Sequence, residues 1–136
     1  ILSVGGANGR ITINSEEAAD IFASTLSKII KKFGFEGVDI DLEGAAVSGT
    51  EYIARGLREV HNEFGDDFII TMAPETYYMH KASDLTGAYY RLAIEIKDIL
   101  KSVILSSTTQ GEILDITISM QDILHSHLLH HWLPCT

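Results

Sequence analysis

The most constraining feature of the sequence is a short run in which aliphatic and acidic residues alternate between two segments of helical spacing. The alternating positions are Val38, Asp39, Ile40, Asp41, Leu42 and Glu43. A period of two predicts a β-strand, with the three acids on one side and the three aliphatic residues on the other. A parallel strand between helices is normally buried on both faces, so the acids need a reason other than packing.

Strand-like and helix-like segments follow one another along the first hundred residues. We predict buried strands at the apolar run that ends at Gly5, at the alternating run, and at Phe68–Ala73. A capping box of Asn14 and Glu17 predicts the start of a helix that ends near Gly34. Further helices are predicted at Thr50–Phe64 and Tyr89–Leu100. This order indicates the α/β class with a parallel sheet.

The composition limits the domain count and the partners. The 136 residues, 46% of them hydrophobic, suffice for one core but not for a complete eight-fold α/β barrel, which needs on the order of 200 residues or more. With 10 Lys+Arg against 19 Asp+Glu, the net charge of −9 argues against nucleic acid as a partner. No apolar run approaches the roughly 18 residues of a membrane span, so we expect no membrane partner. The single cysteine, Cys135, excludes an internal disulfide, and no oligomeric state is predicted.

The three acids suggest acid–base chemistry. In an α/β barrel, strand side chains alternate between the barrel interior and the helix layer, and chemistry lies at the carboxyl ends of the strands. Asp39 and Asp41 would then line the interior, with Glu43 at the carboxyl end. Like charges and burial prevent all three from ionising cheaply. We therefore predict that Glu43 holds a proton that it can donate to a leaving group.

The pattern alone leaves other interpretations open. The acids can form the wet face of an edge strand, or bind a hard cation such as Mg²⁺ through carboxylate oxygens. In the histidine-rich tail, His127 and His131 share the spacing of one helix face but lack further ligands for zinc. We therefore assign no metal and no cofactor.

Three motifs, in order, resemble glycoside hydrolase family 18, the chitinases and their relatives. The family's Asp-Gly-x-Asp-x-Asp-x-Glu strand is matched by residues 36–43, with Glu36 in place of the first Asp. Residues 3–6 match its Ser-x-Gly-Gly motif, and residues 71–75 are similar to the end of its next strand. The resemblance implies that residues 1–100 are a partial catalytic domain, about strands 3 to 5 of a (β/α)8 TIM barrel with their helices. We expect an open three-strand sheet.

The resemblance also implies an activity. The parent would hydrolyse β-1,4-linked N-acetylglucosamine in chitin by a substrate-assisted retaining mechanism, with Glu43 as general acid/base. Asp41 would hold the acetamido N–H, and Asp39 would tune Asp41. The residues implied to contact substrate are Gly6, Met72, Glu75 and Tyr78. Four tyrosines offer faces either to sugars or to the core: Tyr77, Tyr78, Tyr89 and Tyr90.

The resemblance leaves alternatives and implies a compartment. A non-catalytic chitin-binding relative is one alternative, although such members commonly lose the acid that stands here as Glu43. An inactive truncated product and an unrelated carboxylate–metal domain are the others. The start at Ile1, without Met or a signal peptide, suggests a piece of a longer protein, which the family implies to be extracellular.

Beyond Leu100 the resemblance stops, so residues 101–136 are a divergent tail. The codons CAT ACT CAG TTC TAC AAC TCA GGG encode a family-like sixth strand, His-Thr-Gln-Phe-Tyr-Asn-Ser-Gly. Read one base late, they encode Ile-Leu-Ser-Ser-Thr-Thr-Gln-Gly, which is the sequence of residues 104–111. We therefore hypothesise that the tail is a frameshifted translation.

This hypothesis predicts the nucleotide sequence. Sequencing the gene across codons 95–111 should reveal a single-base shift that restores the family reading. If no one-base shift restores it, the hypothesis is wrong.

Overall fold

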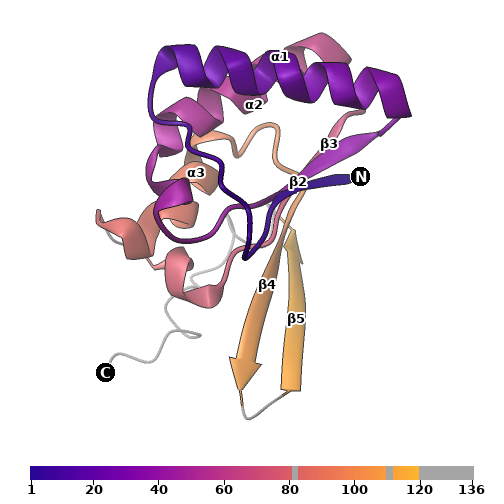
Figure 1. The fold of residues 1–136 in the computed structure, drawn as a ribbon. Coiled ribbons are helices and arrows are strands. Elements are labelled where there is room, and N and C mark those ends of the chain that lie inside the picture. Colours follow the sequence, from indigo (N-terminus) through magenta and orange to yellow (C-terminus); the bar gives the residue numbers. More distant parts are fainter. Residues whose placement is uncertain (81–82, 110–111, 120–136) are drawn as a thin grey trace.

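Four parallel strands and one antiparallel strand form a single sheet in the computed structural model, which describes residues 1–80, 83–109 and 112–119 (Figure 1). The strands lie in chain order: β1 (Leu2–Gly5), β2 (Gly37–Asp41), β3 (Ile69–Met72), β4 (Ser102–Thr109) and β5 (Glu112–Ser119). Pairing is parallel from β1 to β4 and antiparallel between β4 and β5. The predicted α/β class with a parallel sheet is confirmed.

Three α-helices connect the parallel strands. They are α1 (Glu16–Phe33), α2 (Thr50–Phe64) and α3 (Ala88–Glu95). Single 3₁₀ turns η1 (Gly44–Ser48), η2 (Thr76–Met79) and η3 (Leu85–Gly87) lie in the loops after β2 and β3. The bounds of α2 are those predicted from the sequence. Figure 1 shows the helices gathered on one side of β1–β3, while the β4–β5 hairpin extends away from them.

The start of α1 differs from the prediction by one residue. Ser15, not Asn14, is the N-cap, because its backbone is extended and its hydroxyl accepts a hydrogen bond from the Ala18 N–H at 3.1 Å. Both residue types cap helices well, so composition alone does not choose between them. The predicted end at Gly34 is confirmed: Gly34 is left-handed, and its N–H donates to the Ile30 carbonyl at 2.8 Å.

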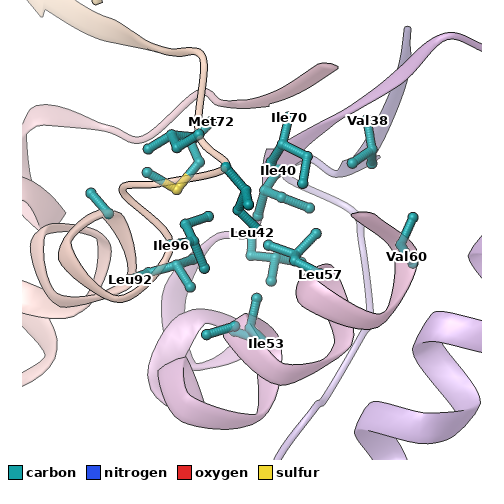
Figure 2. Close-up of a cluster of buried hydrophobic side chains, with 14 of the residues drawn as sticks. Val38, Ile40, Leu42, Ile53, Leu57, Val60, Ile70, Met72, Leu92 and Ile96 are labelled. Carbon is teal, nitrogen blue, oxygen red and sulfur yellow. The ribbon is translucent and has the colours of Figure 1, made fainter. Parts of the chain in front are cut away.

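The aliphatic side of β2 forms the centre of the core. Val38, Ile40 and Leu42 are at most 2% exposed, and Figure 2 shows them among side chains from α2, β3 and the α3 region. Their labelled neighbours are Ile53, Leu57, Val60, Ile70, Met72, Leu92 and Ile96. The aliphatic half of the alternating pattern therefore packs against the helices, as the period of two predicts.

The sheet is larger than the three strands expected. Thr71 pairs with Ser102 and Met72 with Val103, so β4 adds a fourth parallel strand. Residues 102–109 contain only Ser, Thr, Val, Ile and Leu, a composition that includes strong strand formers and no Pro or Gly. Helix α3 ends at Glu95, earlier than predicted. The prediction that residues 101–136 derive from a frameshift stays a hypothesis.

The tail residues discussed for zinc binding and disulfide formation, His127, His131 and Cys135, lie outside the described part of the chain. Among residues 1–80, 83–109 and 112–119, no helix is long and apolar enough to cross a membrane.

A close backbone contact joins the end of β1 to β2. The Gly6 N–H donates to the Asp41 carbonyl at 2.7 Å. Gly5 has φ +123°, and a Cβ on it would lie 2.1 Å from that same carbonyl oxygen. By contrast Gly34 has φ +71° with no atom within 4 Å of such a Cβ.

These two glycines give a matched prediction. Gly34→Ala should lower the free energy of unfolding by about 1–2 kcal/mol, because alanine is strained in the left-handed conformation. Gly5→Ala should cost roughly 2–4 kcal/mol, because a steric overlap adds to the backbone strain. Urea unfolding of both variants measures the free energies of unfolding. Equal decreases in the free energy of unfolding for the two variants would contradict the close contact between Gly5 and the Asp41 carbonyl.

Candidate active site

The first acid of β2 is held by hydroxyl groups from both neighbouring strands. Ser3 on β1 and Thr71 on β3 are both in register with Asp39. The Ser3 Oγ donates to Asp39 Oδ2 at 3.1 Å, and the Thr71 Oγ1 donates to Asp39 Oδ1 at 2.7 Å. Each carboxylate oxygen thus has one fixed donor, and three strands contribute to one row of polar side chains.

These two donors were not predicted as site residues, although a signal for them exists. The residues that follow Ser3, Asp39 and Thr71 are aliphatic or Met and are also in register. Val4 pairs with Ile40, and Ile40 pairs with Met72. In parallel strands, aligned residues point to the same face. Aligning the polar member of each strand would therefore have placed both hydroxyls beside Asp39.

Asp41 lies at the carboxyl end of β2, where several acids converge. Burial raises the pKa of Asp41 above its ordinary value of 3.8, and the charges of Glu43, Asp39 and Glu75 raise it further. The predicted site residues Asp39, Asp41, Glu43 and Glu75 are therefore close enough to interact electrically. Burial and these like charges together favour the protonated form of Asp41.

The predicted residue Gly6 is also brought to this end of the sheet. Its N–H binds the Asp41 main chain, and a Cβ on Gly6 would lie 3.7 Å from Asp41 Oδ2. The bare backbone of Gly6 thus faces the Asp41 carboxylate. Glu43 follows β2 and precedes η1; it is half-buried, and its carbonyl accepts from the Ala46 N–H at 3.3 Å.

The structure places Met72 away from the acids, contrary to its predicted contact with substrate. Met72 is in register with Ile40, so it shares the aliphatic face of the sheet. It is fully buried among the helix-side residues of Figure 2. Parity in a strand explains the correction: Thr71 faces Asp39, so the next residue must face the opposite way.

The tyrosines differ in their surroundings. Tyr77 is exposed, Tyr78 is half-buried, and Tyr89 is completely buried. The Tyr78 ring centroid lies 5.2 Å from that of Tyr77 and 6.5 Å from that of Tyr89. Tyr89 therefore belongs to the core, whereas Tyr77 and Tyr78 keep accessible surface after the end of β3.

The Tyr89 hydroxyl contacts the acidic strand from the core side. It donates to the carbonyl oxygens of Ile40 at 3.1 Å and Leu42 at 2.9 Å. Burial raises the pKa of Tyr89 well above its usual range, so the phenol remains a neutral donor.

The acids do not form a recognisable metal centre. Within the described residues, no three His, Cys, Asp or Glu side chains are grouped as a metal ion would require. The described site offers carboxyl and hydroxyl groups, with the bare backbone of Gly6 and aromatic side chains nearby.

Comparison with known proteins finds similar sequences and similar solved structures. No family model matches the chain. Exochitinase 1 of Streptomyces olivaceoviridis is 36% identical over 93 residues, which cover 58% of this chain and 16% of that protein. A chitinase A structure from Streptomyces coelicolor has a TM-score of 0.70 at 34% identity, over 85% of this chain and 40% of that one. A family GH18 chitinase from Chromobacterium violaceum has a TM-score of 0.71 at 25% identity, over 85% and 35%.

The fold of this chain matches part of the barrel of solved family 18 chitinases. More particularly, the similarities support a chitinase-like fragment that resembles part of glycoside hydrolase family 18, which confirms the resemblance read from the three motifs. It spans 16% of the length of Exochitinase 1 and less than half of either solved chain.

The pKa of Asp41 makes a prediction for stability against pH. A carboxyl with a raised pKa binds its proton more tightly in the folded state, so its contribution to stability falls as the pH rises from about 4 through the folded-state pKa. Asp41→Asn removes this loss. We expect the variant to gain in urea midpoint over wild type as the pH rises from 3.5 towards about 7.

Asp98→Asn is the control of opposite sign. Arg58 holds Asp98 through two hydrogen bonds of 2.7 and 2.8 Å and lowers its pKa to about 2. Its stabilising contribution is complete above the unfolded-state pKa and is lost as the pH falls towards 2. Asp98→Asn should therefore lose stability relative to wild type as the pH rises. A gain for Asp41→Asn that does not change with pH would contradict the burial of that carboxyl.

Proposed function

We propose that this chain carries the catalytic carboxyl groups of an enzyme that hydrolyses chitin or its N-acetylglucosamine oligosaccharides. The observation that carries the proposal is the grouping of acids at the end of β2, where Asp39 is held by Ser3 and Thr71 and the charges of Asp39 and Glu43 act on Asp41. The similarity to chitinases supports the substrate class. We also propose, from the resemblance of the three motifs alone, that the parent protein acts outside the cell.

In the proposed reaction, the carboxyl group of Glu43 protonates the glycosidic oxygen. The carbonyl oxygen of the substrate's own N-acetyl group attacks the anomeric carbon, and the bond to the leaving sugar breaks with its electron pair on the protonated oxygen. The product is an oxazolinium ion. Water then opens this ring at the anomeric carbon, and the Glu43 carboxylate accepts the proton of that water.

Asp41 and Asp39 have supporting roles in this proposal. Asp41 accepts the acetamido N–H and so directs the carbonyl oxygen towards the anomeric carbon, while its negative charge stabilises the oxazolinium ion. The two hydroxyl donors of Asp39 keep that residue in place behind Asp41. An acid whose pKa is raised by burial and by neighbouring carboxyls is expected at a site of proton transfer.

Residues beside the acids would bind the sugar. The backbone of Gly6 faces the Asp41 carboxylate without a side chain, which leaves room for a ligand. Glu75 and the half-buried Tyr78 follow the end of β3, where a polar group and an aromatic face suit a pyranose ring. Met72 is left out of this set because it faces the helices.

A second candidate function is chitin binding without hydrolysis. The feature that favours it is the small fraction of each relative that the chain spans, since a barrel enzyme builds its substrate site from several strand ends. In that case the acids would bind oligosaccharide and the chain would not release product.

The test is hydrolysis of a chromogenic chitobiose substrate by the 136-residue chain, together with calorimetric binding of chitobiose. We expect Glu43→Gln to lower kcat by about 100-fold or more, because a general acid contributes roughly that factor, and to leave the Kd within about threefold. Glu17→Gln, an exposed change on α1, is the matched control and should keep wild-type values.

Three outcomes separate the candidates. Loss of activity confined to Glu43→Gln and insensitive to a chelator supports the hydrolase. Binding without hydrolysis by wild type supports the second candidate. Chelator-sensitive activity, or full activity of Glu43→Gln, contradicts the assignment of Glu43 as the proton donor.

A further inference from the structure

The feature that the proposed reaction does not use is the buried hydroxyl of Tyr89. Tyr89 is the second residue of α3 and is fully buried. Its single proton is shared between the carbonyls of Ile40 and Leu42, at 3.1 and 2.9 Å. A core tyrosine therefore contacts the backbone of β2 at the point where the acidic side chains leave the sheet.

The two carbonyls belong to the peptide planes that carry the acids. The Ile40 carbonyl is bonded to the Asp41 nitrogen, and the Leu42 carbonyl is bonded to the Glu43 nitrogen. Because a peptide unit is planar, holding each carbonyl also holds the plane that enters the following residue. One hydroxyl thus restrains the backbone of both Asp41 and Glu43.

The sheet itself supplies less support at this point. The Ala73 N–H still donates to the Ile40 carbonyl at 2.9 Å, but the next residue is Pro74, which has no N–H to donate. Strand β2 ends at Asp41, so Leu42 and Glu43 lie beyond the regular pairing. A buried carbonyl needs a donor, and for Leu42 the Tyr89 hydroxyl is one.

The position of Tyr89 is itself well determined. Its ring lies in the core, with the Tyr78 ring centroid 6.5 Å away. Arg58 of α2 contacts the carbonyl of Glu95, the last residue of α3, and donates two hydrogen bonds to Asp98 in the segment just after α3. The packing around Tyr89 therefore fixes the position of its hydroxyl, and the hydroxyl in turn restrains the two carbonyls at the end of β2.

We propose that Tyr89 is a positioning residue that sets the orientation of the Asp41 and Glu43 side chains through the backbone. The proposal rests on the proposed function only for its effect on catalysis. Without the hydroxyl, the strand end relaxes, the Glu43 carboxyl moves relative to Asp41, and Asp41 becomes more accessible to water. Substrate binding, which depends on more of the surface, changes less.

Tyr89→Phe removes this hydroxyl while the ring still fills the core. The matched control is Tyr52→Phe, which removes a phenol from the half-buried Tyr52 on α2, next to Glu51. The first readout needs no hydrolysis: ¹³C NMR titration of the Asp41 side-chain carboxyl. We expect its midpoint to fall towards the ordinary aspartate value in Tyr89→Phe and to stay at the wild-type value in Tyr52→Phe.

The second readout is the kinetics of chitobiose hydrolysis. Small displacements of a reacting group cost large factors in rate, so Tyr89→Phe should lower kcat roughly 10- to 100-fold with KM within about twofold. Tyr52→Phe should keep both constants. All measurements are made well below the lowest Tm of the three proteins, so that only folded protein is compared.

The outcomes separate this inference from the proposed function. An Asp41 midpoint that shifts only in Tyr89→Phe supports the positioning role even if wild type hydrolyses nothing, a result that would overturn the proposed function alone. An unchanged midpoint and an unchanged kcat in Tyr89→Phe overturn the positioning role while hydrolysis stands. A Tyr89→Phe chain that does not fold also overturns it, because the hydroxyl then serves the fold as a whole.

Discussion

Strand β2 is paired on both edges, with β1 on one side and β3 on the other, and this constraint governs the rest of the structure. Its backbone groups are committed to the two neighbouring strands, so its side chains have only two directions available. Aliphatic side chains take one direction and build the core with α2 and α3. The acids are left with the other direction, where they must be stabilised by groups that the neighbouring strands provide.

That stabilisation follows from the register. Because β1 and β3 run parallel to β2, one hydroxyl from each lies level with Asp39 and donates to a different carboxylate oxygen. Towards the carboxyl end this support stops, and Asp41 meets like charges instead of donors. The acidic face therefore changes along the strand from a hydrogen-bonded carboxylate to a carboxyl with a raised pKa. In the proposed reaction, Asp39 is the fixed acid behind Asp41, and Asp41 lies between it and the proton donor Glu43.

Much of this arrangement could be predicted from the alternating run, since a period of two assigns both faces of β2 without any knowledge of the fold. The helix bounds of α2 and the end of α1 at Gly34 also follow from local signals. Met72 was misplaced because it was assigned by motif rather than by parity, although Thr71 beside it already determined its direction. The burial of Tyr89 depends on how α3 packs under β2, which no local pattern contains.

The last strands show a different limit. The resemblance of the sequence to family motifs ends near Leu100, yet β4 continues the parallel sheet beyond β3. Strand formation there needs only β-branched and hydroxyl residues with no breaker, and a shifted reading frame can supply these by chance. On the frameshift hypothesis, backbone pairing would survive a change of side chains that removes the family's motif.

The acids on the helix side of the molecule have cationic partners, whereas the acids of β2 do not, and this difference affects the stability of the fold. On the helix side, Arg58 joins α2 to Asp98 in the segment just after α3, and Arg55 joins α2 to Asp20 on α1. These acids have cationic partners, and the lowered pKa of Asp98 shows that its charge is favoured in the folded state. The acids of β2 have hydroxyl donors and one another, and Asp41 resists ionisation. Acids without cationic partners at one strand end lower the stability of the folded state. The opposite face of the same strand offsets this loss, because its aliphatic side chains are completely buried.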